Sequence, residues 1–69
     1  MGEKYSDTRE MVWTPGILVL VDGVEGIVMD YRLSDFKIGV YIDGAVEYFP
    51  DPGVPWFTEA PNIVPLENP

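Results

Sequence analysis

The sequence has no histidine, no cysteine and only four lysine and arginine residues, against twelve aspartate and glutamate residues. Without histidine, it lacks the side chain that most often acts as a general base near neutral pH. Without cysteine, it has no thiolate nucleophile, no disulfide and no Cys/His zinc framework. The glycine-rich phosphate loop and the Asp-rich calcium loop are also missing. We therefore expect a non-catalytic protein with no metal site and no cofactor.

The same imbalance gives a formal net charge of −8 at pH 7. A negative field of this size attracts cationic partners and repels nucleic acid and anionic lipid. There is no apolar run of about 18 residues, and residues 1–10 are polar and mixed in charge, unlike a signal peptide. A lack of cysteine fits a reducing compartment. We expect a cytoplasmic protein that binds a basic protein and binds neither nucleic acid nor membrane.

The chain is short for the amount of apolar surface that it carries. A chain of 69 residues forms at most one domain and buries only about 60% of the surface that its unfolded form exposes. Small domains usually add disulfides, a metal or a partner subunit, and the residues for the first two are missing. Hydrophobic residues make up 46% of the sequence and aromatic residues 13%. These features favour a homodimer.

Proline and glycine divide the chain into a polar leader, residues 1–12, and a β-rich body, residues 13–69. In the leader, Asp7 and Glu10 have the spacing of a capping box, which predicts one helical turn. In the body, β-branched and aromatic residues lie between turn signals. The prolines of segment 50–55 remove backbone donors, so this segment is predicted to be a stiff loop. The predicted strands are residues 17–21, 26–31, 36–42, 45–49 and 62–66. The fold class is therefore all-β, with a small five-stranded barrel as its architecture.

The register of the second hairpin depends on where one carboxylate can lie. Apolar and polar residues alternate over residues 36–42, so one face of this strand is predicted to be buried. A two-residue loop after this strand would place Glu47 opposite Val40, on the buried face. A loop that also includes Ala45 avoids burying the carboxylate and turns Glu47 and Phe49 outward. We therefore predict the three-residue loop.

Both faces of segment 17–21 are apolar, because each of its residues is Ile, Leu or Val. Such a strand is buried on both sides. Its second face is covered either by the leader or the proline-rich loop, or by another subunit in a dimer. The sequence leaves both explanations open.

Residues 15–28 read Pro-Gly-Ile-Leu-Val-Leu-Val-Asp-Gly-Val-Glu-Gly-Ile-Val. This stretch resembles the opening hairpin of the KOW and Tudor branches of the SH3-like barrels, which have a glycine, a valine-rich strand, a glycine-bearing turn and then Gly-x-Val. Residues 62–67, Asn-Ile-Val-Pro-Leu-Glu, resemble their last strand. The resemblance extends over residues 15–67 and implies an SH3-like barrel.

The resemblance also implies a binding mode through aromatic side chains. Tudor domains hold a cation in an aromatic cage beside an acidic residue, and here Asp30 or Asp43 would be the acid. The rings that could form such a cage are Tyr31, Tyr41, Tyr48, Phe49 and Trp56. The chain departs from RNA-binding KOW domains, which are usually basic, and lacks the Ala-Leu-Tyr-Asp-Tyr segment of peptide-binding SH3 domains. One alternative is therefore an adaptor that binds a protein or peptide, or a second subunit, through Tyr41, Phe49 and Trp56. A structural virion or assembly component is another.

The acidic residues are predicted to gather at one end of the sheet. Alternate turns of an up-and-down meander lie at the same end, so the turns that contain Asp22 and Asp43 should be neighbours. The predicted acidic face consists of Asp22, Glu25, Asp43 and Glu47. At the opposite end, Arg32 and Lys37 should partly offset Asp30 and Asp35, and Asp51 should join this end through the proline-rich loop.

This concentration of carboxylates suggests mimicry of nucleic acid. Outward residues two apart on a strand are separated by about 6.6 Å, and the phosphates of DNA form a similar line of negative charge. Carboxylates on a rigid sheet can therefore occupy the basic groove of a DNA-binding protein. In size and charge the chain resembles the small acidic DNA-mimic inhibitors of phages. Binding of this kind should weaken steeply as salt is added.

Overall fold

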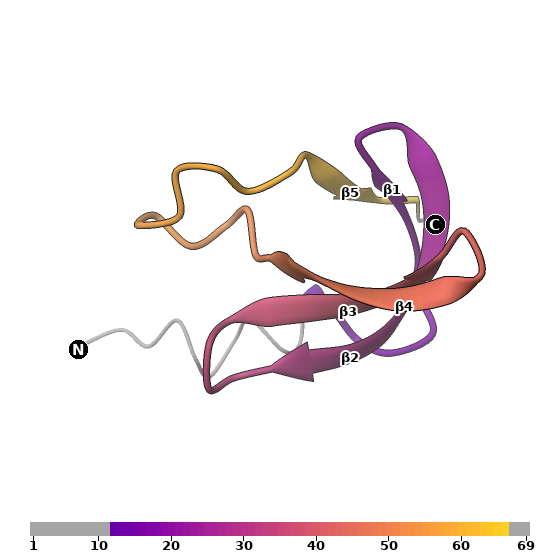
Figure 1. Ribbon diagram of the computed structural model, residues 1–69, viewed down its shortest axis with the longest axis horizontal. Helices are drawn as coiled ribbons and strands as arrows, with labels where there is room; N and C mark the ends of the chain where they lie inside the picture. Colours follow the sequence, from indigo (N-terminus) through magenta and orange to yellow (C-terminus); the bar gives the residue numbers. More distant parts are fainter. Residues whose placement is uncertain (1–11, 67–69) are drawn as a thin grey trace.

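Five antiparallel strands form a single curved sheet in the computed structural model, which describes residues 12–66 (Figure 1). The strands are β1 (Leu18–Val21), β2 (Val24–Arg32), β3 (Lys37–Ile42), β4 (Ala45–Pro50) and β5 (Ile63–Pro65). Their order across the sheet is β4-β3-β2-β1-β5, so the first four strands form a meander and β5 returns beside β1. The predicted all-β class with five strands is confirmed. The predicted helical turn at Asp7 and Glu10 lies outside the described residues.

Two tight turns connect the strands at one end of the sheet. Asp22 and Gly23 have φ angles of 49° and 88°, and Asp43 and Gly44 have angles of 55° and 85°. Positive φ at both central residues is the signature of the two-residue type I′ hairpin, whose twist matches that of the flanking strands. Asp tolerates this left-handed conformation better than most residues because its short side chain forms local hydrogen bonds.

The predicted three-residue loop of the second hairpin is therefore wrong. Ile42 pairs with Ala45, and Val40 pairs with Glu47. The prediction assumed that the side of β4 facing the same way as Val40 would be buried. Because β4 lies at the edge of the sheet, Glu47 remains exposed in this register. Phe49 does not point outward as predicted, but packs, partly buried, against the core.

The proline-rich loop was predicted to start at Pro50, but it starts one residue later. Pro50 is the last residue of β4 and pairs with Lys37. A proline is tolerated at the edge of a sheet where its missing N–H would face away from the neighbouring strand. The loop proper therefore begins at Asp51.

A β-bulge in β2 changes which side chains face the core. Val28 pairs with Val40, but the next registered pair is Asp30 with Gly39, which leaves Met29 as the extra residue. The insertion exchanges the two faces for the rest of the strand. As a result Tyr31 faces inward opposite Ile38, and Asp30 faces outward.

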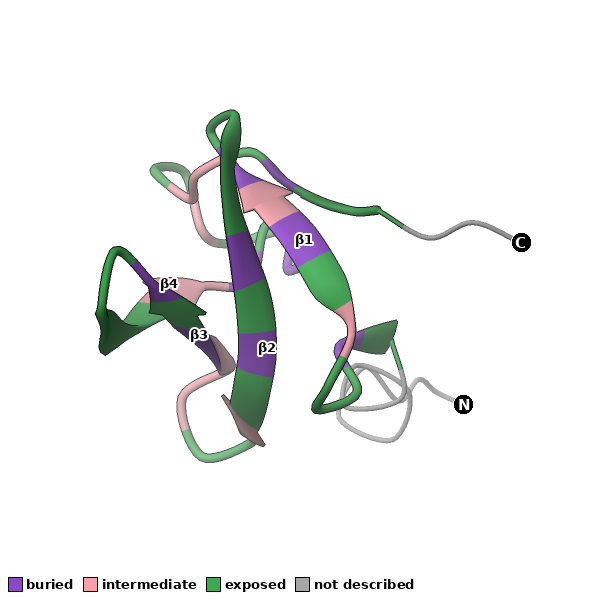
Figure 2. Ribbon diagram, turned by 90° about the vertical axis from the view of Figure 1, so that its right-hand side faces the viewer, coloured by how far each residue is buried: buried purple, intermediate pink, exposed green. Residues whose placement is uncertain are grey.

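The core lies on the concave side of the sheet. Along β1, and along β2 up to the bulge, buried residues alternate with exposed or half-buried ones (Figure 2). Its buried members are Trp13, Val19, Val21, Val28, Ile38, Val40, Ile42 and Ile63. On the other face of β1, Leu18 is 47% exposed and Leu20 is half-buried. The two apolar faces of β1 are thus unequal: one is core, and the other lies at the surface of the part of the chain that the structure describes.

Asp51 is fully buried and links three distant parts of the chain. Its Oδ1 accepts hydrogen bonds from Trp13 Nε1 at 3.2 Å and from the Gly53 amide at 2.9 Å. Its Oδ2 accepts one from the Tyr31 hydroxyl at 2.7 Å. Asp51 lies beside the β2–β3 turn, as predicted, because its amide donates to the carbonyl oxygen of Phe36. It is, however, part of the interior, where it fixes the start of the loop, and is not a surface charge.

Candidate functional site

Four apolar side chains form a line across the outer, convex face of the sheet. Leu18 pairs with Ile27, Ile27 with Tyr41, and Tyr41 with Val46. Directly paired residues point to the same side of a sheet, so these four side chains lie next to one another. We call them the transverse row. Their exposed fractions lie between 37% and 47% although their neighbours Val19, Val28 and Val40 are completely buried.

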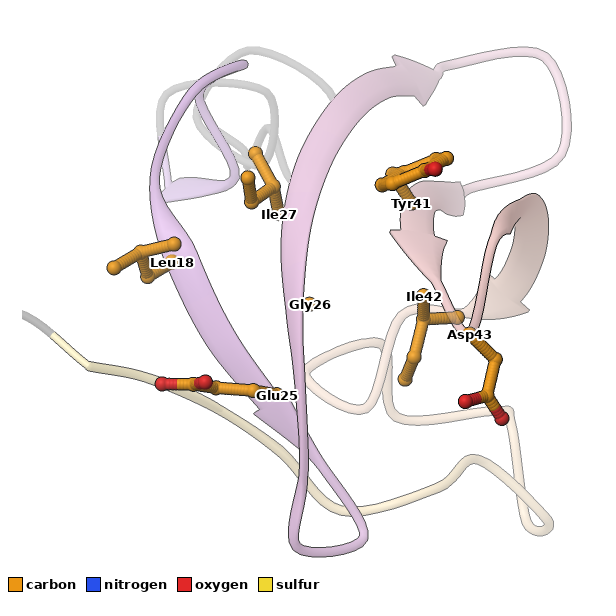
Figure 3. Close-up of a pocket in the computed structure, with 7 residues that line it drawn as sticks. All are labelled: Leu18, Glu25, Gly26, Ile27, Tyr41, Ile42 and Asp43. Carbon is orange, nitrogen blue, oxygen red and sulfur yellow. The ribbon is translucent and has the colours of Figure 1, made fainter.

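An open depression of about 300 Å³ lies beside the transverse row, where β2 and β3 separate (Figure 3). Ile27 and Tyr41 form the first registered pair between these strands, and the depression lies just beyond it. Its lining residues are Leu18, Glu25, Gly26, Ile27, Tyr41, Ile42 and Asp43. Figure 3 shows the carboxylates of Glu25 and Asp43 on opposite sides of the depression, with Glu25 extended toward β1. The surface is thus apolar at its centre and acidic at two sides.

The four residues of the predicted acidic face have different positions. Glu25 and Asp43 do lie at the same depression, which confirms that the two tight turns are neighbours. Asp22 is hydrogen-bonded to the residue that precedes β5. Its Oδ1 accepts a hydrogen bond from the Asn62 amide at 3.0 Å, and its own amide donates to the Asn62 carbonyl oxygen at 2.8 Å. Glu47 is exposed, but it faces the side opposite to the transverse row.

The predicted aromatic residues are also spread over the molecule. Tyr41 belongs to the transverse row, whereas Phe49 packs against the core. Trp56 is 58% exposed and lies in the loop before β5, edge-on to Phe36 with ring centroids 5.6 Å apart. Tyr31 faces inward and binds Asp51. The rings that the sequence suggested for one cage therefore lie on both sides of the sheet and in a loop.

A polar network centred on Tyr48 lies on the outer face near the β2–β3 turn. The sequence predicted that Arg32 would offset the acidic residues at this end, but it did not place Tyr48 among them. The Tyr48 hydroxyl donates a 2.9 Å hydrogen bond to Asp30, and the Arg32 guanidinium lies 4.2 Å from the centre of the Tyr48 ring. Arg32 also binds Asp35 through two hydrogen bonds, of 3.1 and 2.8 Å. The bulge in β2 brings Asp30 to the outer face, and no local sequence signal marks it.

The pKa values in this network follow from its hydrogen bonds. The bond to Asp30 raises the pKa of Tyr48, because the carboxylate favours the protonated phenol. The paired hydrogen bonds raise the pKa of Arg32 and lower the pKa of Asp35. The predicted offset of charge at this end of the sheet is therefore confirmed for Arg32 and Asp35, which form an ion pair.

Within residues 12–66, no group of three or more acidic side chains is arranged to hold a metal ion. The same residues include no helix with the length and apolar character needed to cross a membrane. Comparisons with protein-family models, with curated proteins and with solved structures gave no match for this chain.

Proposed function

We propose that this chain is a non-catalytic binding protein that docks on the basic surface of a partner protein through the outer face of its sheet. The proposal is carried by the position of Glu25 and Asp43 on either side of an apolar depression. Apolar area at the centre of an interface contributes affinity, and charges around it select the partner and speed its association. A partner that presents apolar side chains flanked by Lys or Arg fits this pattern.

The specific form that we propose is an inhibitor that acts as a DNA mimic, of the kind that phages encode, in a cytoplasmic setting. Proteins that bind nucleic acid carry a basic surface, and such a surface is attracted electrostatically to a chain of net charge −8. The acidic turns at one end of the sheet support this form, since they concentrate negative charge near the depression.

A second copy of the chain is a poorer fit to the same surface. A symmetric dimer through the outer face would bring two sets of Glu25 and Asp43 together, and like charges across an interface oppose association. The predicted homodimer would therefore need another surface. Sedimentation analysis of the purified chain tests whether it forms.

The main test is capture of partners from a lysate by the immobilised chain at about 0.1 M and about 1 M salt, where the Debye length is about 10 Å and about 3 Å. We expect a basic protein to bind at low salt and to be released at high salt. Glu25→Gln and Asp43→Asn should each weaken capture, and together they should abolish it. Glu59→Gln, which removes one charge from the exposed loop before β5, is the matched control. Equal capture by the double variant and by the control would refute the proposal.

Duplex DNA separates the mimic from other basic-partner binders. If the captured protein uses its DNA-binding surface, excess duplex DNA will release it from the wild-type chain. Release by high salt without release by DNA would leave a basic partner but reject mimicry.

The adaptor that binds through exposed aromatics is the second candidate, and the exposure of Trp56 favours it. Trp56 and Phe36 form an aromatic pair at the other end of the molecule from the depression. If this pair is the binding surface, Trp56→Ala will abolish capture and Glu25→Gln with Asp43→Asn will not. Capture in this case should also persist at high salt, because apolar contacts are not screened.

A further inference from the structure

The strand β4 forms one edge of the sheet, and its backbone hydrogen-bonding groups alternate in direction. In the order β4-β3-β2-β1-β5, no strand of residues 12–66 pairs with the far side of β4. The residues that flank a two-residue hairpin loop form a hydrogen-bonded pair, and the pairs then alternate along the ladder. Ile42 and Ala45 are the first such pair, so Val46 and Tyr48 direct their backbone N–H and C=O groups away from β3.

Two observations agree with this alternation. The same count places Pro50 among the residues whose N–H position faces away from β3, so its missing donor costs no bond in the ladder. One residue further, the Asp51 amide does bond toward β3, to the carbonyl oxygen of Phe36 at 3.0 Å. The open edge of β4 therefore offers the backbone groups of Val46 and Tyr48, and Pro50 ends the run of donors.

The apolar transverse row reaches this edge. Val46 is its last member and is 46% exposed, and Tyr48, on the same face, is 38% exposed. A strand added to β4 would place a side chain directly beside Val46 and another beside Tyr48. An apolar side chain beside Val46 would extend the row by one strand, and an apolar side chain beside Tyr48 would pack against the tyrosine ring on the same face.

The charge of Glu47 decides which occupant fits. Two copies of the chain could pair in antiparallel fashion through their β4 edges. If the outward backbone groups of both Val46 and Tyr48 are used, Val46 pairs with Tyr48 of the other copy. Glu47 would then lie directly opposite Glu47 of that copy, on the two-fold axis. Like charges in directly opposed positions are destabilising, and charged residues on an edge strand are a common protection against self-association. A Lys or Arg opposite Glu47 would instead form a cross-strand ion pair.

We propose that the open edge of β4 binds an extended segment of the partner by strand addition. The segment carries an apolar residue beside Val46, a Lys or Arg opposite Glu47 and an apolar residue beside Tyr48. Main-chain hydrogen bonds would provide affinity, and the alternating side chains would provide specificity. This inference rests on the proposed function in one respect, namely that the partner is basic.

The test uses a capped heptapeptide of alternating valine and lysine as the probe, and NMR amide shifts of the full chain as the readout. We expect the largest shifts at the Val46 and Tyr48 amides. The same peptide with glutamate in place of lysine should bind at least 10-fold more weakly. The variant Glu47→Lys should reverse this preference.

Two matched pairs test the hydrogen bonds. Val46→Pro removes the outward N–H at a position of the same kind as Pro50 and should weaken binding at least 10-fold, whereas Val46→Ala keeps the N–H and should weaken it much less. The second pair changes the peptide and leaves the protein as wild type, so it tests the same hydrogen bonds even if Val46→Pro does not fold. Backbone N-methylation of the valines should abolish binding because their N–H groups face β4, and N-methylation of the lysines should not.

Equal binding by both N-methylated peptides would overturn strand addition, as would failure of the valine–lysine peptide to bind. Shifts confined to the depression, lost in the variant with Glu25→Gln and Asp43→Asn, would reject the edge and leave the proposed function standing. Shifts at the edge, together with partner capture that the double variant does not affect, would support strand addition and reject the proposed docking through the outer face. A wild-type dimer that Val46→Pro converts to a monomer would identify a second copy as the occupant.

Discussion

The hydroxyl of Tyr31 donates a 2.7 Å hydrogen bond to Oδ2 of Asp51, whose side chain has no exposed surface. Trp13 and the Gly53 amide donate to the other carboxylate oxygen. These bonds join the start of the described chain, the inward-facing part of β2 and the loop after β4. Asp51 is therefore a structural carboxylate, in contrast to the exposed Glu25 and Asp43.

Removing the acceptor at Asp51 should destabilise the fold. In Asp51→Ala, the donors on Trp13, Tyr31 and Gly53 lose their acceptor in the interior, and a buried unsatisfied donor is costly. We expect a loss of about 3 kcal/mol in the free energy of unfolding, measured by urea denaturation. Asp51→Asn should cost less, about 1 kcal/mol, because its amide oxygen can still accept from Trp13 and Gly53. Equal midpoints for wild type and Asp51→Ala would contradict this role.

Two glycines should differ in their tolerance of alanine. A Cβ at Gly26 would lie 2.6 Å from Val40 Cγ1 and 3.0 Å from the Tyr41 carbonyl oxygen, so both core and backbone would have to shift. Gly26→Ala should therefore cost about 2 kcal/mol. At Gly39 the three atoms nearest to the Cβ would all belong to the side chain of Tyr48, the closest at 2.8 Å, and this edge side chain can shift with only a loss of its exposed contacts to Asp30 and Arg32. Gly39→Ala should cost less than about 1 kcal/mol, and the order of the two in urea denaturation is the check.

The second tight turn should accept a change of charge but not a change of conformation. Asp43 and Gly44 both have positive φ, and Asn-Gly is a preferred pair for this turn type. Asp43→Asn should leave the melting temperature unchanged or slightly higher, which makes it a clean probe of charge in the binding assays. Gly44→Ala should lower stability by about 1 kcal/mol, because alanine is strained at φ 85°. A marked loss of stability in Asp43→Asn would show that its carboxylate has a structural role.

The phenol of Tyr48 should titrate at higher pH than an ordinary tyrosine. Its hydrogen bond to Asp30 raises its pKa above the usual 10.0, and Asp30→Asn should bring the pKa back toward that value, as followed by ¹³C NMR of the ring. Because the folded-state pKa is the higher one, the stabilisation is fully present below pH 10 and is lost as pH rises through the raised pKa. The stability of wild type and Asp30→Asn should therefore converge in strongly alkaline solution. An unchanged Tyr48 titration in Asp30→Asn would refute this explanation, and Glu59→Gln serves as the charge control.

Local sequence was enough to place the strands, because β-branched residues and turn residues act within a few positions of one another. The predicted strand 17–21 differs from β1 by one residue, and 45–49 differs from β4 by its last residue, Pro50. The neighbouring positions of the Asp22 and Asp43 turns also followed from the sequence, since a meander returns every second turn to the same end.

Part of the candidate site was predictable from the positions of the turns and from the apolar pattern of segment 17–21, and part was not. Glu25 and Asp43 were expected together because they lie at adjacent turns, and the apolar outer face was visible in the second face of segment 17–21. Phe49 and Glu47 were assigned to the wrong face, because the register was chosen by assuming that one side of β4 is buried. Whether a strand is central or at an edge depends on the order of all five strands, and within β4 only its last residue, Pro50, is typical of an edge.

The sequence by itself determined the acidic character, the all-β class, and the position of the strands and turns, because these depend on composition and on neighbours in the chain. The tertiary structure decided the hairpin register, the change of face at the bulge in β2 and the burial of Asp51. The hydrogen bonds of Asp51 to Trp13 and Tyr31 span 38 and 20 residues, so they exist only once the sheet has formed. Of the twelve carboxylates, the sheet leaves Glu25 and Asp43 beside an apolar depression and places Glu47 at the centre of an open edge.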